Sequence, residues 1–143
     1  MIDFEECVAQ GLLKAIPPSP VQAEEQIKKA KVLLDEAKKA LKSESPNSAV
    51  ITAYSAALDA SRAVLFRDGF REKSHACVAS YLKAKYPKEL GTTLIYLFDQ
   101  YRDRRHKTLY SGDYYPTMEE AKRIVLFAEE FLGKVAALLK HRG

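Results

Sequence analysis

The sequence lacks tryptophan and is poor in residues that break regular structure, with six glycines and six prolines among 143 residues. These residues fall between stretches of helical periodicity, where turns and loops are expected. The two cysteines, Cys7 and Cys77, lie in helical patterns far apart and match no metal or redox spacing. We therefore expect both to be small, buried hydrophobic residues.

The sequence pattern predicts neither an export signal nor a membrane span. The first six residues, Met1 to Glu6, are acidic where a signal peptide is basic, and no long apolar run follows. No stretch approaches the roughly 20 apolar residues of a membrane span. We expect a cytoplasmic protein that makes no use of a membrane.

The sequence also lacks the motifs of several classes of enzyme. The glycines are scattered and form no phosphate-binding loop, and no histidine, cysteine and carboxylate set has zinc spacing. No serine sits in the context of a nucleophile elbow. We expect neither a metal nor a cofactor.

The composition is that of an ordinary globular protein, with 47% apolar and 29% charged residues. The length suits a single domain over residues 1–143. A net charge of +4 permits a phosphate-rich partner without requiring one.

Helical periodicity runs through nearly the whole chain, and no convincing alternating strand interrupts it. The pattern predicts an all-α fold, an antiparallel bundle of five or six helices. The helices are expected at about residues 3–16, from 19 onward, from 45 to 69, from 74 to 87, from about 89 to 109, and from 117 onward. The alanine-rich third helix lets its neighbours approach closely, so we expect it at the centre of the bundle.

Capping signals support these boundaries. Ser19 is a good N-cap and is followed by Pro20, and Gln22 completes a capping box. Thr117 and Glu120 form a second capping box at the start of the last helix.

The fifth helix changes from apolar to basic in the stretch Arg102-Asp103-Arg104-Arg105-His106-Lys107. Residues 102, 105 and 106 are spaced i, i+3 and i+4 and therefore share one face, where like charges cost a few tenths of a kcal/mol per pair. An anion on that face would relieve this repulsion. For Lys107 alone, interaction with the helix macrodipole is explanation enough.

The histidines and tyrosines near this cluster have two interpretations each. His106 is the natural proton-transfer residue near neutral pH, unless it only hydrogen-bonds a neighbouring carboxylate. His75 is expected to have a structural role at a helix start. Tyr110, Tyr114 and Tyr115 could stack on the bases of single-stranded nucleic acid, although packing against the bundle is the commoner role.

The order of elements resembles the HEPN superfamily. Three features carry the resemblance: the small-residue-rich helix 49–66, the stretch 68–75 that follows it, and the Arg/His turn that ends in Tyr110. The resemblance implies a homodimer and, in many members, a metal-independent ribonuclease whose arginine and histidine motifs face one cleft from two subunits. It also implies a minimal nucleotidyltransferase as partner, with the HEPN protein as toxin and the transferase as antitoxin.

The family motif fits this sequence in two registers. With Arg105 as the motif arginine, His106 is the polar residue and Tyr110 stands where the histidine belongs, as in a variant pattern that also contains Arg102. With Arg102 as the motif arginine, Asp103 is the polar residue and His106 follows at a shorter spacing than usual. A tyrosine, with a pKa of about 10, is a weak base at neutral pH.

The resemblance and the cluster together suggest the following roles. The expected catalytic residues are Arg102, Arg105, His106 and Tyr110, and the expected nucleic-acid or phosphate-binding residues are Arg104, Lys107 and Tyr114. On a straight helix, residues 105 and 110 lie about 140° apart. Three functions remain open: a toxin-type ribonuclease, a non-catalytic protein that binds RNA or a nucleotide or docks a nucleotidyltransferase, and an adaptor whose arginines only pair with Asp99, Asp103 or Asp113.

Overall fold

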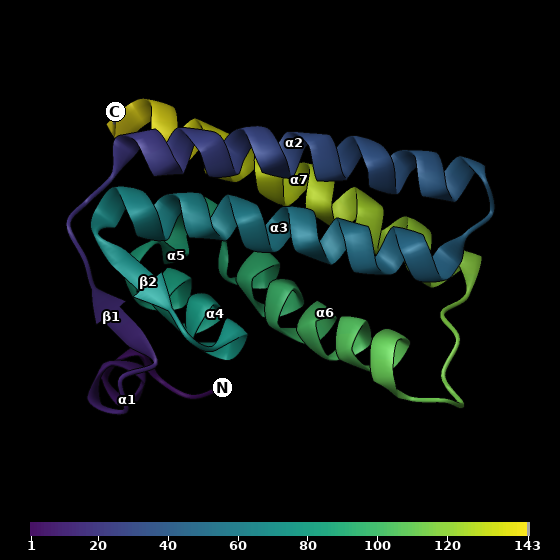
Figure 1. Cartoon of the computed structure of the whole chain (residues 1–143), viewed down its shortest axis with the longest axis horizontal. Coiled ribbons are helices and arrows are strands. Elements are labelled where there is room, and N and C mark those ends of the chain that lie inside the picture. Colours follow the sequence, from purple (N-terminus) through teal and green to yellow (C-terminus); the bar gives the residue numbers. More distant parts are fainter. Residues whose placement is uncertain (143) are drawn as a thin grey trace.

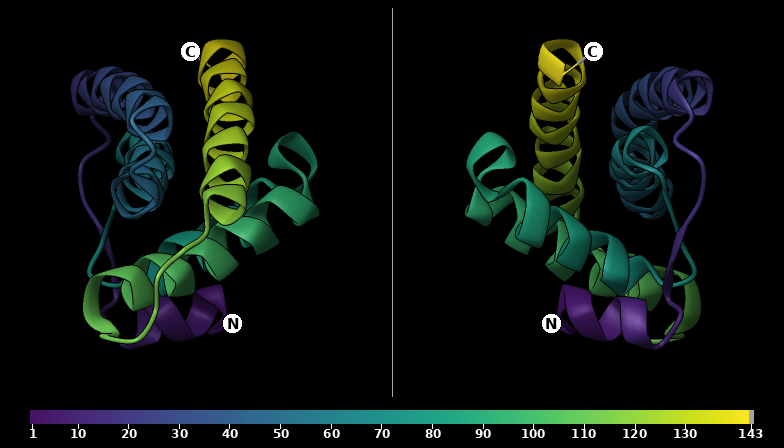
Figure 2. Two further views of the ribbon diagram at one scale, coloured as in Figure 1. Left: turned by 90° about the vertical axis from the view of Figure 1, so that its right-hand side faces the viewer. Right: turned by 90° about the vertical axis from the view of Figure 1, so that its left-hand side faces the viewer.

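Four long helices make up most of the computed structural model, which describes residues 1–142 (Figure 1). They are α2 (Pro20–Lys42), α3 (Pro46–Asp68), α6 (Thr92–Tyr110) and α7 (Met118–Arg142). Helices α2 and α3 lie side by side as a long hairpin, and α7 packs against both (Figures 1 and 2). Helix α6 lies beneath α3, and its C-terminal end is far from the start of α2 (Figure 1). The predicted all-α bundle is therefore confirmed.

Helix α3 is the centre of the bundle because its small residues admit close neighbours on several sides. Its six alanines at positions 49, 53, 56, 57, 60 and 63 are all fully buried. An aromatic column joins it to two other helices: the Tyr54 ring stacks on Phe98 of α6 at 5.5 Å between centroids, and Phe98 stacks on Phe131 of α7 at 5.2 Å. This column holds α6 at a defined position beside α3.

The expectation that no stretch could cross a membrane was too strict for α3. This helix is long and apolar enough to span a bilayer by length and composition alone, but 67% of its most apolar window is buried inside the bundle. Burial among neighbouring helices explains its apolar character, as for the core helix of a soluble protein.

The capping predictions at two helix starts are confirmed in their main contacts. The Gln22 amide donates to the Ser19 hydroxyl at 3.2 Å at the start of α2. Before α7, the Glu120 amide donates to the Thr117 hydroxyl at 3.1 Å, and the Glu120 carboxylate accepts from the Thr117 amide at 3.3 Å. This reciprocal pair is the capping box that the sequence predicts.

The first expected helix, residues 3–16, is only partly helical. Helix α1 (Phe4–Ala9) ends before Gly11, which has φ +72°. The next residues form strand β1 (Leu13–Ala15), which pairs antiparallel with β2 (Phe70–Glu72). The expectation of no strand was wrong because this pairing joins segments more than 50 residues apart, and no local periodicity records it.

The fourth and fifth expected helices also differ in their boundaries. Helix α4 (His75–Lys85) ends before Pro87, as predicted, and a single turn, α5 (Pro87–Leu90), follows it. Gly91, with φ +88°, separates α5 from α6. The expected helix from residue 89 therefore begins at Thr92, because a residue at positive φ cannot continue a right-handed helix.

The two cysteines form a disulfide bond, with Cα atoms 5.8 Å apart. The expectation of burial is confirmed, but the expectation of two free hydrophobic residues was wrong. Packing of α1 against α4 brings Cys7 and Cys77 together across 70 residues of sequence, which spacing rules for metal or redox motifs do not address. Cytosolic proteins rarely keep disulfides, so a cytoplasmic location stays a prediction.

Candidate functional site

A cleft of about 470 Å³ lies between the start of α4 and the C-terminal half of α6. Its lining residues are Lys73, Ser74, His75, Ala76, Arg102, Asp103, Arg105 and His106. The cleft thus combines three residues predicted from the sequence, Arg102, Arg105 and His106, with a second histidine from another helix. We call it the basic cleft.

The contribution of α6 follows from its helical spacing. Residues 102, 105 and 106 line the same cleft, as their i, i+3, i+4 spacing predicts. The preceding residue, Tyr101, packs against Phe127 of α7 at 5.0 Å between ring centroids. Because α6 contacts α4 as well as α3 and α7, the residues on its two sides have different neighbours.

Arg105 differs from the other two arginines of α6 and from Lys107 in having no carboxylate partner. Arg102 pairs with Asp99 at 3.3 Å, Arg104 with Glu120 at 3.6 Å, and Lys107 with Asp103 at 3.2 Å. None of the ion pairs among the described residues includes Arg105, and its buried Nε has no hydrogen-bond partner. Ion pairing within the protein therefore accounts for its neighbours and leaves Arg105 unexplained.

Tyr54 of α3 lies beside this unpaired arginine. The Arg105 guanidinium carbon is 5.8 Å from the Tyr54 ring centroid, within cation–π range. Tyr54 is 1% exposed, and its hydroxyl also has no hydrogen-bond partner. Burial raises the pKa of Tyr54 well above its ordinary range, although Arg102 and Arg105 oppose this effect. In the described part of the chain, the only two buried side-chain polar atoms without partners thus belong to Arg105 and Tyr54, whose side chains lie together beside the basic cleft.

His75 is the residue of this site that sequence reasoning assigned to a structural role. It is the first residue of α4, is partly buried, and has its ring centroid 6.4 Å from that of Tyr54. Burial lowers the pKa of His75, the positive charges of Arg62, Arg105 and Arg102 lower it further, and Glu72 opposes them. A lowered pKa favours the neutral imidazole near pH 7, the form that can accept a proton. Its position after a helix cap was visible in the sequence, but its place in one cleft with residues of α6 was not.

His106 and Tyr110 form a separate, more exposed pair on the last turn of α6. Their ring centroids are 4.9 Å apart, and Tyr110 is 70% exposed. Among the described hydrogen bonds, none joins His106 to a carboxylate, which was the structural alternative for this histidine. Helix α6 stays helical through Tyr110, so Arg105 and Tyr110 project in different directions.

The three residues predicted to bind phosphate lie in other surroundings. Arg104 and Tyr114 both contact Glu120 at the start of α7, and the Tyr114 hydroxyl donates to that carboxylate at 2.8 Å. This hydrogen bond is the main reason that the pKa of Glu120 lies below its ordinary value. Lys107 is paired with Asp103 on the exposed side of α6. The basic cleft does not include these three residues, and their role in phosphate binding stays a prediction.

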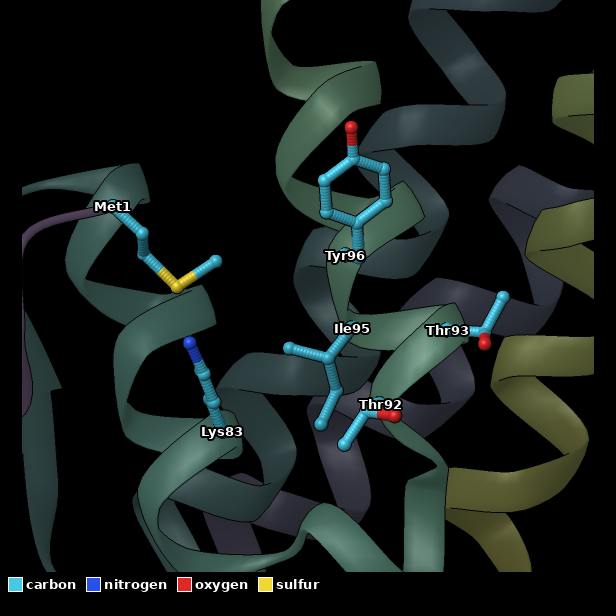
Figure 3. A pocket seen from close by; sticks show the side chains of 6 residues that line it. All are labelled: Met1, Lys83, Thr92, Thr93, Ile95 and Tyr96. Atoms are coloured by element: carbon cyan, nitrogen blue, oxygen red, sulfur yellow. The ribbon is translucent and has the colours of Figure 1, made fainter.

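A second hollow, of about 370 Å³, lies between α4 and the start of α6 (Figure 3). Lys83 and Met1 line one side, and Thr92, Thr93, Ile95 and Tyr96 of α6 line the other (Figure 3). The lining carries one cationic side chain, Lys83, and neither a histidine nor an arginine. It is therefore less suited to phosphate chemistry than the basic cleft. Across the residues that the structure describes, no three histidine, cysteine or carboxylate side chains are grouped to hold a metal ion.

The fold and this site define a class of protein: a small helical bundle with a basic, histidine-lined cleft between two of its helices. A family model described as the HEPN domain matches residues 23–138. The match covers most of the chain, so the protein belongs to the HEPN domain family. The matched range contains every residue that lines the basic cleft, and α1 and β1 lie outside it. A comparison with curated proteins finds no match to this chain.

Proposed function

We propose that this protein binds single-stranded RNA in the basic cleft and cleaves it without a metal ion, as the toxin-like component of a two-gene module with a minimal nucleotidyltransferase. The single observation that carries the proposal is Arg105, a partly buried guanidinium without a carboxylate partner in a cleft that also contains Arg102 and His106. A guanidinium fork matches the oxygens of a phosphate, so a phosphodiester would supply the missing acceptors.

The chemistry of such a cleavage needs few groups. A base removes the proton of the ribose 2′-hydroxyl, the 2′-oxygen attacks phosphorus, and the 5′-oxygen leaves with a proton. Arg102 and Arg105 would stabilise the charge that develops on the phosphorus oxygens. His106, exposed at the cleft, would exchange protons with the substrate.

The first experiment measures cleavage of labelled single-stranded RNA in EDTA by the wild type and by Arg105→Gln and His106→Ala variants. We expect His106→Ala to lose at least about 100-fold in rate, since general acid–base groups contribute roughly that much or more. We expect Arg105→Gln to lose about 100-fold or more, since loss of one donor that stabilises transition-state charge has an effect of that order. Arg123→Gln is the matched control, because Arg123 is an exposed arginine of α7 that pairs with Glu119. Cleavage that requires a metal, or equal rates for wild type and His106→Ala, would contradict the proposal.

RNA binding can be measured separately from cleavage by using 2′-deoxy oligonucleotides, which lack the attacking hydroxyl. We expect wild-type affinity to fall steeply with salt and the slope against log salt to decrease by about 1 in Arg105→Gln. Affinity that is indifferent to salt would exclude phosphate contacts. A slope for Arg105→Gln that equals that of Arg123→Gln would exclude Arg105 as one of them.

The proposed partners are a second copy of the chain and a minimal nucleotidyltransferase. Two copies would bring two sets of Arg102, Arg105 and His106 to one substrate. A minimal nucleotidyltransferase gene beside the gene for this protein would support the module, and sedimentation of the purified protein, alone and with that transferase, tests both partners. A purely monomeric protein with no affinity for the transferase would leave only the RNA-directed part of the proposal.

A non-catalytic, RNA-binding role is the second candidate, and the pair of His106 and Tyr110 favours it. Tyr110 is largely exposed and lies against the His106 ring, so the two rings offer a surface on which a base could stack. Salt-dependent RNA binding without any cleavage would favour this candidate over the ribonuclease.

A further inference from the structure

We propose that His75, at the start of α4, is a catalytic residue of the basic cleft: it accepts the proton of the attacking 2′-hydroxyl, and His106 of α6 returns a proton to the leaving 5′-oxygen. This inference rests on the proposed cleavage of RNA and names the base that the family motif, with Tyr110 in its last position, leaves unassigned.

The position of His75 supports this role. His75 and His106 come from different helices, yet both line the cleft that contains Arg102 and Arg105. We therefore place one phosphodiester in this cleft, where it would meet the two arginines and the two imidazoles. An acid and a base on two sides of an anchored phosphate suit a displacement in which the entering and leaving oxygens lie on opposite sides of phosphorus.

The charges around His75 favour its neutral form. The titratable and charged groups around His75 come from three elements. Helix α3 contributes Tyr54 and Arg62, and the segment before α4 contributes Glu72 and Lys73. Helix α6 contributes Arg102, Asp103, Arg105 and His106. Arginines outnumber the carboxylates in this set. The Arg62–Glu72 pair, at 2.7 Å, and the Arg102–Asp99 pair, at 3.3 Å, each balance one positive and one negative charge. Arg105, which is in none of the ion pairs among the described residues, leaves a positive charge near His75. A neutral imidazole beside bound phosphate can accept a proton, whereas a protonated one cannot.

Burial and packing also fix the ring of His75. The His75 ring lies beside that of Tyr54, which is stacked on Phe98. One side of the imidazole therefore faces the aromatic column that joins α3, α6 and α7. Tyr110, by contrast, lies at the exposed end of α6 and projects away from Arg105. A base must stay within hydrogen-bond distance of one hydroxyl, and the more restrained residue meets this requirement better.

The proposed step balances without any co-reactant. The 2′-hydroxyl loses its proton to His75, the bond between O2′ and phosphorus forms, and the bond between phosphorus and O5′ breaks. Protonated His106 gives its proton to O5′. The products are a 2′,3′-cyclic phosphate and a 5′-hydroxyl, and one proton moves from His75 to His106 through solvent to restore the starting state.

The test is single-turnover cleavage of an RNA with one defined site, measured against pH for wild type, His75→Gln and His75→Ala. Lys28→Gln on α2 is the control for removal of a remote basic group, since Lys28 is exposed and pairs with Glu24 on its own helix. Affinity for the 2′-deoxy oligonucleotide is measured for every variant. Thermal unfolding of each variant shows whether it is folded.

We expect His75→Gln to cleave at least about 100-fold more slowly than wild type and to bind the 2′-deoxy oligonucleotide within about threefold of it. The wild-type rate should fall on the acidic side as His75 gains a proton, and this limb should be absent in His75→Gln. Added imidazole should restore part of the activity of His75→Ala, which a merely structural role would not allow.

Other outcomes separate the two proposals. Near-wild-type cleavage by His75→Gln, or products with a 5′-phosphate, would overturn the role of His75 and leave RNA cleavage by the protein intact. Loss of cleavage together with an equal loss of affinity would make His75 a binding residue and overturn its role as base. A wild-type protein that binds RNA and never cleaves it would overturn both proposals in favour of the binding function.

Discussion

At the scale of single residues, the adjacent Arg104 and Arg105 show how one step along a helix changes a side chain's surroundings. Successive residues of an α-helix are rotated by about 100°. Arg104 meets Glu120 of α7, whereas Arg105 lies over Tyr54 of α3 and has no acidic partner. The two arginines therefore differ in charge balance although they are adjacent in the sequence.

The unpaired hydroxyl of Tyr54 leads to a prediction about stability. Tyr54→Phe should raise the free energy of unfolding by about 1 kcal/mol, because it removes a buried polar group that has no hydrogen bond. Tyr81→Phe is the matched control. The Tyr81 hydroxyl donates to the Asp68 carboxylate at 2.7 Å, and its loss should lower the free energy of unfolding by about 2 kcal/mol. Urea unfolding of both variants measures the two effects, and a destabilised Tyr54→Phe would show that this hydroxyl has a favourable interaction.

Gly69 leads to a second prediction at this scale. It has φ +89°, and an added Cβ would lie 2.8 Å from the Ile16 carbonyl oxygen. Gly11 also has positive φ, +72°, but open space around it. Left-handed backbone costs a non-glycine residue about 1 kcal/mol or more, so both glycine-to-alanine variants should be destabilised. In urea unfolding, the free energy of unfolding should fall by at least about 1 kcal/mol more in Gly69→Ala than in Gly11→Ala. An equal fall in both variants would show that the backbone around residue 69 shifts to accommodate the added Cβ.

At the scale of elements, the N-terminal segment supports the side of the basic cleft that α4 provides. This segment lies before the family match and is joined to the bundle in three ways. Strand β1 pairs with β2, the Ile2 carbonyl accepts a hydrogen bond from Ser80, and Cys7 is bonded to Cys77. These contacts hold both β2 and α4, and His75 lies between β2 and the body of α4.

The disulfide should contribute measurably to stability. A Cys7→Ala/Cys77→Ala double variant should lose about 2–4 kcal/mol in the free energy of unfolding, because the bond constrains a long loop in the unfolded chain. Reductant should lower the stability of the wild type and leave that of the double variant unchanged. Thiol titration of the unfolded, unreduced protein provides the check: two free thiols in that experiment would mean that the bond does not form.

At the scale of the whole molecule, stability should depend on pH through His75. Its pKa is lower in the folded protein than the ordinary value of 6.5, so the unfolded chain binds more protons as pH falls through this range. Stability should therefore be greatest above about pH 7 and decrease as the pH falls below 6.5 towards the lowered folded pKa. The carboxylate of Glu120, whose pKa is also lowered, affects stability only at more acidic pH.

The measurement is the urea midpoint of wild type and His75→Gln at intervals from pH 8 to pH 5. The wild-type midpoint should decrease towards the acidic end, and the decrease should be smaller in His75→Gln. Parallel curves for the two proteins would show that His75 titrates alike in the folded and unfolded states. This test needs neither RNA nor activity, so it examines the surroundings of His75 independently of the proposed reaction.

The sequence alone determined the features that depend on neighbours along the chain. Helical periodicity, the capping residues at Ser19 and Thr117, and the alanines of the third helix predicted the bundle and its central helix. The spacing of Arg102, Arg105 and His106 placed them on one face of α6, and the structure confirms that they line one cleft. Each of these inferences involves residues within a few turns of one helix, where local geometry decides the outcome.

Only the tertiary structure decided the features that join distant segments. The Cys7–Cys77 bond, the β1–β2 pair and the position of His75 opposite α6 all depend on the packing of α1, α4 and α6. The sequence separates Arg105 from Arg104 by helix face, but only the packing of α3 and α7 around α6 shows that Arg104 has an acidic partner and Arg105 has none. The burial of a side chain and the partners available to it depend on residues that are remote in the sequence. The basic cleft is therefore defined by the fold, although half of its lining residues lie on the single helix α6.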